Sequence, residues 1–458
     1  MLSPQPASTD AEKYTRHSFE AFRVLPWELD GATVRLRYSL DDELSFTETI
    51  TYPSVIDLSI PGVSAALDLL SAVAGVSYFK VASPLRIHFE GTPFSVDSIQ
   101  LFRRLYDEGL REYAYRNGLP VPFETTFANT SAEWRPFLTW PIPRPEALGR
   151  LLLPMGGGRD SGLLASLLRH RGPTLMSVGA NSYVERLADE LGLSYFRVTR
   201  SLSPNIGELN RGRGLNGHVP VTAINSLVSV VAALLTDHER VVMANESSAS
   251  SPTITLPDGC EINHQFSKSL EVELSMNAAL TCAGVPIHYF SALRAYGELA
   301  IARAFATKPE LFPLIMSCNR AFLRDAAQRS DGWCGQCAKC RFVFLTLAPF
   351  STPAQLTTMF GHDLLNSSSL VDQAGFADLL SDERPFDCVG EVSEARLAVG
   401  LLANTPEWAT HPIVVHLAGL VAPLDRVSLA AALATGLAAH PNHAVPADIL
   451  ADVSVAFQ

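Results

Sequence analysis

Residues 151–162 read Leu-Leu-Leu-Pro-Met-Gly-Gly-Gly-Arg-Asp-Ser-Gly, a short apolar run followed by a glycine turn. Leu151 to Leu153 are typical of a buried strand. Three successive glycines let the backbone turn with positive φ and come close to a ligand. Ser161 opens a segment with helical spacing that ends near Arg169. A strand, a glycine turn and a helix start aim free backbone N–H groups and a positive dipole end at one point, so the stretch predicts an anion-binding loop.

The loop differs from two common phosphate loops. No Gly-Lys-Ser/Thr follows the glycines, which excludes the Walker loop, and the glycine spacing fits the dinucleotide fingerprint poorly. Asp160 would repel a phosphate unless it held a metal ion. The order Gly156-Gly157-Gly158-Arg159-Asp160-Ser161 resembles the PP-loop of the N-type ATP pyrophosphatases, Ser-Gly-Gly-x-Asp-Ser, with glycine in place of the first serine. A glycine-rich turn that binds no ligand is the alternative.

The PP-loop resemblance implies a set of ATP contacts. Such loops bind the β,γ-pyrophosphate of ATP while a nucleophile attacks the α-phosphate. It implies that Gly156–Gly158 and Ser161 contact pyrophosphate and that Asp160 binds Mg²⁺. It also implies that Arg159 or Lys268 neutralises phosphate charge. Val178 and Gly179 inherit the adenine contact, and loss of the first serine removes one hydroxyl contact.

Strands and helices alternate after the loop. Strands are expected at 173–178, 194–198, 240–244 and 285–288, and helices at 182–191, 220–235, 267–280 and 293–305. This order predicts an α/β fold with a right-handed, parallel, doubly wound sheet that binds ligands at the carboxyl ends of its strands. With the loop, the resemblance makes it a PP-loop core similar to the adenine nucleotide α-hydrolases. Asn245-Glu246 follows the strand expected at 240–244, and such polar pairs rarely lie there without partners.

Residues 1–145 are predicted to form a separate α+β domain, residues 146–350 the core with a metal site, and residues 351–458 a helical region. Alternating apolar residues at 34–40 and 44–52 indicate two paired strands, and helices are expected at 63–73 and 98–117. Pro141, Pro143 and Pro145 form a stiff linker. The last region is rich in alanine and leucine.

A polar segment, residues 263–273, precedes another helix. Ser267 is expected to cap this helix, with Glu271 and Glu273 near its favourable end. We interpret Glu273 as part of a solvated acidic face. His264 and Lys268 lie at or before the helix start and are candidates to meet a phosphate or a carboxylate.

Three cysteines lie close together in Cys334-Gly-Gln-Cys337-Ala-Lys-Cys340. Three thiolates at this spacing suit one tetrahedral Zn²⁺, and Cys318 is available upstream as the fourth ligand. The order resembles the zinc site that follows the PP-loop core in cyano-deazaguanine synthases. An iron–sulfur cluster is the weaker reading because no partner motif for redox chemistry is present. Unbound buried thiols are the remaining alternative.

The bulk composition narrows the classes of partner. The chain has 458 residues, a net charge of −12 and seven cysteines. This acidic balance argues against tight nucleic-acid binding, which depends on Lys and Arg. We expect a cytoplasmic protein without membrane association, because no secretion signal or membrane-spanning segment is evident and the cysteines fit a reducing compartment.

Several stretches together resemble one narrower family, the UDP-N-acetylmuramoyl-L-alanyl-L-glutamate epimerases of peptidoglycan synthesis. They are the glycine loop, the cysteine-rich stretch, Asn216-Gly217-His218-Val219-Pro220-Val221-Thr222, Asn245-Glu246-Ser247-Ser248-Ala249-Ser250, Asn263-His264-Gln265 and Cys318-Asn319-Arg320-Ala321-Phe322. The match covers about 151–350 well. It implies ATP-dependent inversion of the terminal L-Glu of the UDP-N-acetylmuramoyl dipeptide to D-Glu, through an adenylated carboxylate, with release of AMP and pyrophosphate.

The expected chemistry needs a proton-transfer group. His264 is the first candidate because an unperturbed histidine titrates near working pH, and Cys388 is the second because a thiol with a tuned pKa can serve carbon-acid inversion. Lys268 and Asp160 complete the predicted catalytic set. Asn245 and Glu246 complete the predicted ATP site. Two alternatives stay open: a PP-loop enzyme that adenylates another carboxylate or tRNA, and an ATP-binding zinc protein without turnover.

Overall fold

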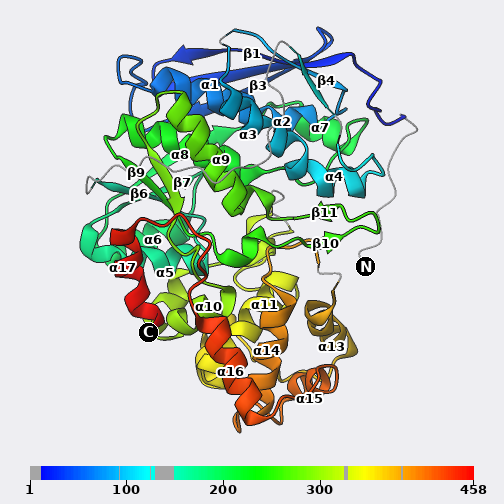
Figure 1. Cartoon of the computed structure of the whole chain (residues 1–458), viewed down its shortest axis with the longest axis vertical. Coiled ribbons are helices and arrows are strands. Elements are labelled where there is room, and N and C mark those ends of the chain that lie inside the picture. The colour runs from blue at the N-terminus through cyan, green and yellow to red at the C-terminus, as the bar shows by residue number, and fades with distance from the viewer. Residues whose placement is uncertain (1–11, 92, 124, 129–148, 324–327, 383–384) are drawn as a thin grey trace. The chain divides into compact units, whose positions relative to one another are not determined.

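The computed structural model describes residues 12–91, 93–123, 125–128, 149–323, 328–382 and 385–458. Contacts group the chain into two compact units (Figure 1). The first contains Met1–Pro143, Arg197–Glu239 and Leu274–Ile287, and the second Arg144–Phe196, Arg240–Glu273 and His288–Gln458. This grouping differs from the three consecutive segments 1–145, 146–350 and 351–458 predicted above. The predicted proline linker lies outside the described residues.

The sheet of the first unit is mostly antiparallel. Its strand order is β3-β2-β1-β4-β5, where β1 to β3 are antiparallel and β4 and β5 add in parallel. The last residues of β8 pair with β3, Ser201 opposite Thr49. The alternation predicted for the second and third strands is confirmed, because Val34, Leu36 and Tyr38 are all fully buried. The bounds are β1 Ala21–Asp30, β2 Thr33–Leu40, β3 Leu44–Thr51, β4 Arg86–Phe89, β5 Thr126–Ala128 and β8 Tyr195–Ser201.

Helices pack on this sheet, and α1 lies against α8. The helix expected at 98–117 is broken into α3, η1 and α4. The break falls at Asp107, which ends α3 and whose carboxylate accepts a hydrogen bond from the backbone N–H of Phe123 at 2.7 Å. The bounds are α1 Val63–Ala74, α2 Val76–Phe79, α3 Val96–Tyr106, η1 Glu108–Leu110, α4 Arg111–Arg116, α7 Ile206–Arg211, α8 Val221–Leu235 and α9 Leu270–Cys282, whose first turn belongs to the second unit.

The second unit has the parallel sheet predicted from the sequence. Its strand order is β12-β9-β6-β7, and every neighbouring pair in this run is parallel. The start of β8 follows, because the N–H of Leu175 donates to the carbonyl of Ser194 at 2.8 Å. From β6 the chain winds outward first through β7 and later through β9 and β12, so the order reverses between β6 and β9. That switch point is where open parallel sheets bind ligands. The bounds are β6 Leu151–Pro154, β7 Thr174–Val178, β9 Arg240–Met243 and β12 His288–Ser291.

Helices surround this sheet and form the rest of the unit, and α-helices and 3₁₀ turns make up the regular structure of the described residues after Pro353. The strand expected at 285–288 lies at 288–291, and the following helix starts at Glu298 rather than 293, so Ser291 ends a strand and caps no helix. A two-stranded hairpin, β10 Ile254–Thr255 and β11 Glu261–Ile262, precedes η4. The helices are α5 Arg159–Leu167, α6 Ser182–Leu191, α10 Glu298–Ala306, α11 Ala338–Leu347, α12 Pro353–Phe360, α13 Leu370–Ala377, α14 Val392–Ala403, α15 Pro412–Ala418, α16 Arg426–Leu437 and α17 Ala447–Ser454.

Short 3₁₀ turns connect these helices: η2 Arg169–Arg171, η3 Ser247–Ser250, η4 Phe266–Lys268, η5 Pro309–Leu314, η6 Asn319–Phe322, η8 Ala348–Phe350, η9 Asp378–Leu380 and η10 Val455–Phe457. Within the described part of the chain, no helix combines the length and the apolar character needed to cross a membrane.

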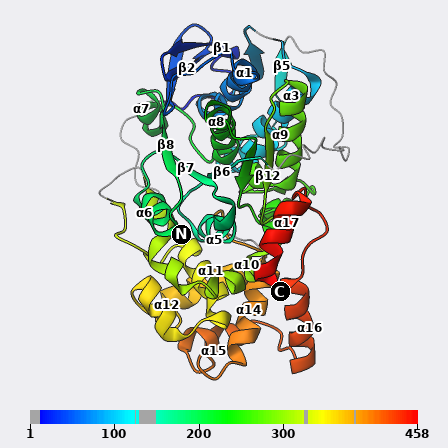
Figure 2. The ribbon, with the colours of Figure 1, turned by 90° about the vertical axis from the view of Figure 1, so that its left-hand side faces the viewer.

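The final helix of the chain, α17, returns to the parallel core and lies against α5 (Figure 2). Asp448 on α17 accepts hydrogen bonds from Arg171 at 2.9 Å and from Arg240 at 2.7 Å. Asp452, one turn later, pairs with the Nε of Arg171. Because Arg240 is 4% exposed, its charge depends on this carboxylate rather than on water.

We predict that Asp448→Ala lowers the free energy of unfolding by about 1–3 kcal/mol, because it leaves two arginines short of a partner. Urea denaturation followed by circular dichroism measures this. Glu407→Ala, at an exposed glutamate, is the control and should change stability little. Equal stability of the two variants would contradict the role of this ion-pair cluster.

Candidate active site

The glycine loop lies at the carboxyl end of β6 and is held from both sides. The side-chain amide of Asn181 donates to the carbonyl of Gly156 at 3.0 Å, and the N–H of Arg159 donates to the hydroxyl of Ser317 at 3.1 Å. Gly157 has a φ of 80°, and a Cβ there would lie 2.9 Å from Asn181. A Cβ on Gly158 would lie 3.1 Å from the Ser317 hydroxyl. The loop therefore requires glycine at 157 and is tightly packed at 158, and it leads into the N-terminus of α5, the geometry that suits a phosphate group.

Arg159, the first residue of α5, is directed into the protein. Its side chain is 1% exposed and forms ion pairs with Glu298, at the start of α10, and with Asp160 at 2.7 Å. Burial would raise the pKa of Glu298, but the charges of Arg159 and Lys339 outweigh it and lower that pKa to about 2. Glu298 is therefore a carboxylate that neutralises Arg159. Arg159 and Lys268 are the two residues expected to neutralise phosphate. Of these two, Arg159 already pairs with a carboxylate inside the protein.

The end of β9 carries the predicted polar pair. The Asn245 amide donates to the hydroxyl of Ser291 at 3.0 Å, which joins the ends of β9 and β12. Glu246 is 4% exposed. Burial and then the charge of Glu298 raise its pKa, while Lys268 opposes this shift. Both residues thus lie at the switch point of the sheet, on the β9 side of the glycine loop.

Val178 and Gly179, the predicted adenine contacts, lie at the end of β7. Gly179 has a φ of 87°, and the hydroxyl of Ser177 donates to its carbonyl at 2.8 Å. Asn181 follows as the cap of α6 and links this turn to the glycine loop. The two turns are adjacent, as expected for neighbouring strands of one parallel sheet.

A buried arginine, Arg294, organises the segment before α9. It donates to the carbonyl of Glu246 at 2.5 Å and to the carbonyl of Lys268, and it pairs with Glu273 at 3.2 Å. The prediction that Glu273 belongs to a solvated acidic face was wrong, because its side chain is 1% exposed. Ser267 is not the cap either. Ser269 precedes the helix, and its hydroxyl accepts from the N–H of Val272 at 3.3 Å.

The two proton-transfer candidates, His264 and Cys388, come together with Lys268 of the predicted catalytic set. The ammonium of Lys268 lies 3.5 Å from the sulfur of Cys388, and His264 forms a hydrogen bond with the same thiol. Burial would raise the pKa of Cys388, but the charge of Lys268 and the His264 hydrogen bond outweigh it and lower that pKa to about 6. The Lys268 ammonium also donates a hydrogen bond to the side-chain oxygen of Gln265, 3.0 Å away. Cys388 is therefore a thiolate at neutral pH.

Lys268 is attracted both to Cys388 and to the carboxylates near the glycine loop. Burial would lower its pKa, but the negative charges of Cys388, Glu246 and Asp160 raise it above its usual range. These residues come from the glycine loop, the end of β9, the turn before α9 and the segment before α14. They form one cluster of alternating charge at the carboxyl edge of the parallel sheet.

Lys339 is a site residue that the sequence patterns did not reveal. Its ammonium lies 3.6 Å from the Oε1 of Glu298. Burial would lower its pKa, but Glu298 and then Asp160 raise it. Lys339 lies between Cys337 and Cys340 in the sequence, so the turn that holds these two cysteines also positions the lysine. The sequence patterns also did not reveal Glu298, Arg294 and Ser317. Each is a single polar residue without a motif around it, so only its partners in the structure reveal its role.

Four cysteines, Cys318, Cys334, Cys337 and Cys340, have sulfur atoms within 4.8 Å of one another and could hold a metal ion. The sulfurs of Cys334 and Cys340 are 3.8 Å apart. Four sulfurs bound tetrahedrally to one zinc at about 2.3 Å lie about 3.8 Å from one another, so the geometry fits zinc. The N–H groups of Cys337 and Cys340 donate to the sulfurs of Cys334 and Cys337, each at 3.4 Å, as thiolates require. A hydrogen bond with Cys334, and others with the remaining two thiols, lower the pKa of Cys318.

The fold defines a class of protein: a parallel α/β unit with a cluster of charged side chains at the switch point of its sheet. Comparisons with known proteins identify the family. The model of the MurL N-terminal domain matches residues 13–292, and that of the MurL C-terminal domain matches residues 314–431. The chain therefore belongs to the MurL family, which confirms the narrower resemblance. No solved structure matches it.

Three relatives share the name UDP-N-acetyl-alpha-D-muramoyl-L-alanyl-L-glutamate epimerase. The protein of Micromonospora sp. is 38% identical over 442 residues, which cover 93% of this chain and 96% of the relative. That of Salinispora tropica is 40% identical over 88% of this chain and 89% of its own length. That of Xanthomonas oryzae pv. oryzae is 36% identical, with 88% and 90% covered.

We predict that Cys388 is alkylated as a thiolate. Its rate of reaction with iodoacetamide should rise through about pH 6 and level off by pH 8, because its pKa is lowered to about 6. Peptide mass spectrometry measures this rate at each cysteine. Cys282 is the matched control. Burial and a hydrogen bond to Asp97 raise its pKa to about 11, so its rate should still be rising at pH 9. Identical profiles for the two cysteines would contradict the charge arrangement around Cys388.

Proposed function

We propose that this chain inverts the terminal L-Glu of UDP-N-acetylmuramoyl-L-alanyl-L-glutamate to D-Glu in an ATP-dependent reaction through an adenylated carboxylate. The names of its full-length relatives support the epimerisation and the small-molecule substrate. One observation carries the proposal for this chain: a thiolate, Cys388, lies beside Lys268 in the same charge cluster as Asp160 of the glycine loop. A proton acceptor and a candidate phosphate loop thus belong to one site.

The order of steps follows from carbon acidity. A proton on the Cα next to a carboxylate is very weakly acidic, because the carbanion would form beside a negative charge. Bonding of a carboxylate oxygen to the α-phosphorus of ATP, with pyrophosphate as leaving group, removes that charge. The Cα–H bond can then break and a proton can return on the opposite face. Water finally attacks the acyl carbon, which releases AMP and the D-Glu carboxylate.

The residues have distinct proposed roles. Gly156–Gly158 and Ser161 bind the pyrophosphate, and Asp160 would hold Mg²⁺, which neutralises phosphate charge. Val178 and Gly179 contact adenine, and Asn245 and Glu246 border the nucleotide. Lys268 and Lys339 supply positive charge for the anionic carboxylate and phosphates. The pair of Cys388 and His264 carries the proton, with the Cys388 thiolate as the acceptor, since its pKa of about 6 leaves it deprotonated at neutral pH.

We predict that deuterium enters Cα only when ATP is present. The enzyme with the L-Glu substrate in D₂O should incorporate no deuterium. Addition of ATP and Mg²⁺ should give D-Glu product with deuterium at Cα, together with AMP and pyrophosphate, as NMR and mass spectrometry measure. Exchange by the wild-type enzyme without ATP would refute the adenylation-first order.

Three variants separate the roles within this experiment. Cys388→Ala should retain ATP–pyrophosphate exchange but lose Cα exchange by about 10²–10⁴-fold, the usual contribution of a general base. His264→Asn should do the same if His264 rather than Cys388 takes the proton. Asp160→Asn should lose both activities, while Cys260→Ser, at a cysteine outside the cluster, should lose neither. Normal Cα exchange by Cys388→Ala and His264→Asn alike would show that the base lies elsewhere.

We also propose that the four cysteines bind one structural zinc ion. Elemental analysis should find about one zinc per chain. Cys334→Ser should lower both the zinc content and the melting temperature, with Cys260→Ser as the control that changes neither. A zinc-free preparation with the full melting temperature and activity would contradict a structural role for the metal.

A further inference from the structure

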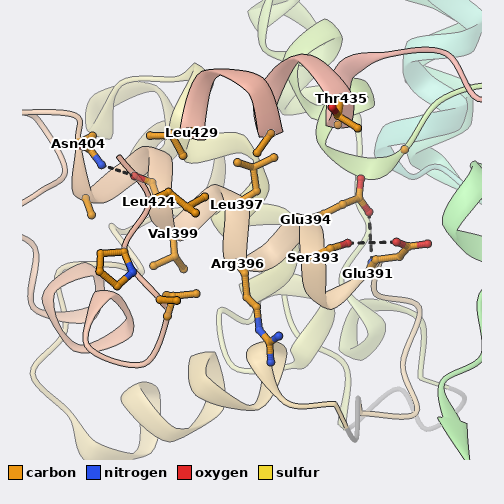
Figure 3. Close-up of a pocket in the computed structure, with 18 of the residues that line it drawn as sticks. Glu391, Ser393, Glu394, Arg396, Leu397, Val399, Asn404, Leu424, Leu429 and Thr435 are labelled. Atoms are coloured by element: carbon orange, nitrogen blue, oxygen red, sulfur yellow. Dashed lines mark hydrogen bonds between the residues drawn. The ribbon is translucent and has the colours of Figure 1, made fainter. Parts of the chain in front are cut away.

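A cavity of about 850 Å³ in the helical part of the second unit takes no part in the proposed reaction (Figure 3). It lies between α14, α16 and residues 418–424. Most of its wall is apolar, formed by side chains that include Leu397, Val399, Leu424 and Leu429. The volume falls within the range of about 300–1,000 Å³ that small-molecule sites occupy.

The two carboxyl groups of the cavity lie at one end. Figure 3 shows Glu391, Ser393 and Glu394 there, with Leu424 and Asn404 toward the other end. Glu391 accepts from the hydroxyl of Ser251 at 2.6 Å and from that of Ser393 at 3.2 Å. The N–H of Leu299 donates to Glu394 at 2.9 Å. The two side chains also form the capping box at the start of α14, so both carboxyl groups are held in place at this end of the cavity.

Among the described residues that line the cavity, no lysine or arginine forms an ion pair with Glu391 or Glu394, although the imidazole of His440 also lines it. Arg396 is the sole lysine or arginine among the described residues that line the cavity, and it pairs with Asp382 at 3.3 Å and with the carbonyl of Leu380 at 2.8 Å. In Figure 3 its guanidinium points away from the leucines. Burial and then the charge of Glu298 raise the pKa of Glu394 to about 8. Burial is the larger cause, so the raised pKa leaves Glu394 largely protonated at pH 7, and a cation bound beside it would lower that pKa again.

This chemistry selects one class of ligand. Phosphates and carboxylates would meet two glutamates and find no available arginine or lysine, which excludes ATP and the nucleotide dipeptide. A neutral hydrocarbon would fill the apolar part but leave the acidic end unmatched. We propose that the cavity is a second ligand site, which binds a small aliphatic amine with its ammonium beside Glu391 and Glu394 and its alkyl chain among the leucines.

A short chain of contacts joins this cavity to the glycine loop. Glu394 holds the N–H of Leu299 in the first turn of α10. The preceding residue, Glu298, is the carboxylate that pairs with Arg159 next to the glycine loop. Two residues, Leu299 and Glu298, therefore link Glu394 to Arg159.

The experiment is a calorimetric titration of the full chain with three probes of equal chain length: n-octylamine, n-octanol and n-octanoate at pH 7. The amine should bind saturably and at least about tenfold more tightly than the alcohol, and octanoate should bind most weakly. Equal affinities for the three probes, or no saturable binding of the amine, would overturn the proposal. The titration needs no turnover, so its result is independent of the proposed reaction.

Variants locate the probe. Ala432→Phe fills the cavity from α16 and should abolish amine binding. Ala431→Phe, at the exposed neighbouring position that does not line the cavity, is the matched control and should bind as the wild type does. Glu391→Gln should remove most of the preference for amine over alcohol while keeping the hydrogen bond of an amide. If the amine bound equally well to Ala432→Phe and Ala431→Phe, its site would lie elsewhere and the proposal would be wrong.

Discussion

The candidate active site depends on the buried guanidinium of Arg294. It holds the backbone at Glu246, the end of β9, and the backbone at Lys268, the turn before α9, and its charge is balanced by Glu273. Two loops that carry site residues are thereby fixed to each other rather than only to the sheet. Removing one partner of such a buried pair typically costs about 3–5 kcal/mol, so the arrangement tolerates neither Arg294 nor Glu273 alone.

A second buried pair performs the same task on the other side of the switch point. Glu298 and Arg159 join the start of α10 to the start of α5, and Lys339 adds a further positive charge to Glu298. The cluster thus contains charged groups that pair with one another inside the protein. Part of that charge is structural, because Glu298 neutralises Arg159. Lys268 instead interacts with both Asp160 of the glycine loop and the thiolate of Cys388. The distinction between a structural and a reacting charge is visible only in three dimensions.

The sequence predicted the parallel sheet, the glycine loop, the polar end of β9 and the four-cysteine cluster, because each depends on local pattern or short spacing. It also selected His264, Lys268 and Cys388 as candidates, but their mutual contact joins residues more than 100 positions apart. The same distance explains the errors. Glu273 has the appearance of a solvated helix-start carboxylate until Arg294 is found beside it. The boundaries near β12 and α10 shifted because Ser291 resembles a helix cap in sequence, whereas its hydroxyl serves Asn245.

The order in which the chain contributes to its two compact units has a consequence for synthesis on the ribosome. The chain leaves the second unit after Phe196, re-enters it at Arg240, leaves it after Glu273 and returns at His288. The central strands β6 and β7 therefore emerge well before β9 and β12 can pair with the growing sheet. The first unit is complete in sequence at Ile287, whereas α17 follows every other α-helix and strand of the second unit. The nascent chain must keep the apolar edge of β6 from aggregating throughout that interval, and no contiguous fragment of this chain contains either unit without part of the other.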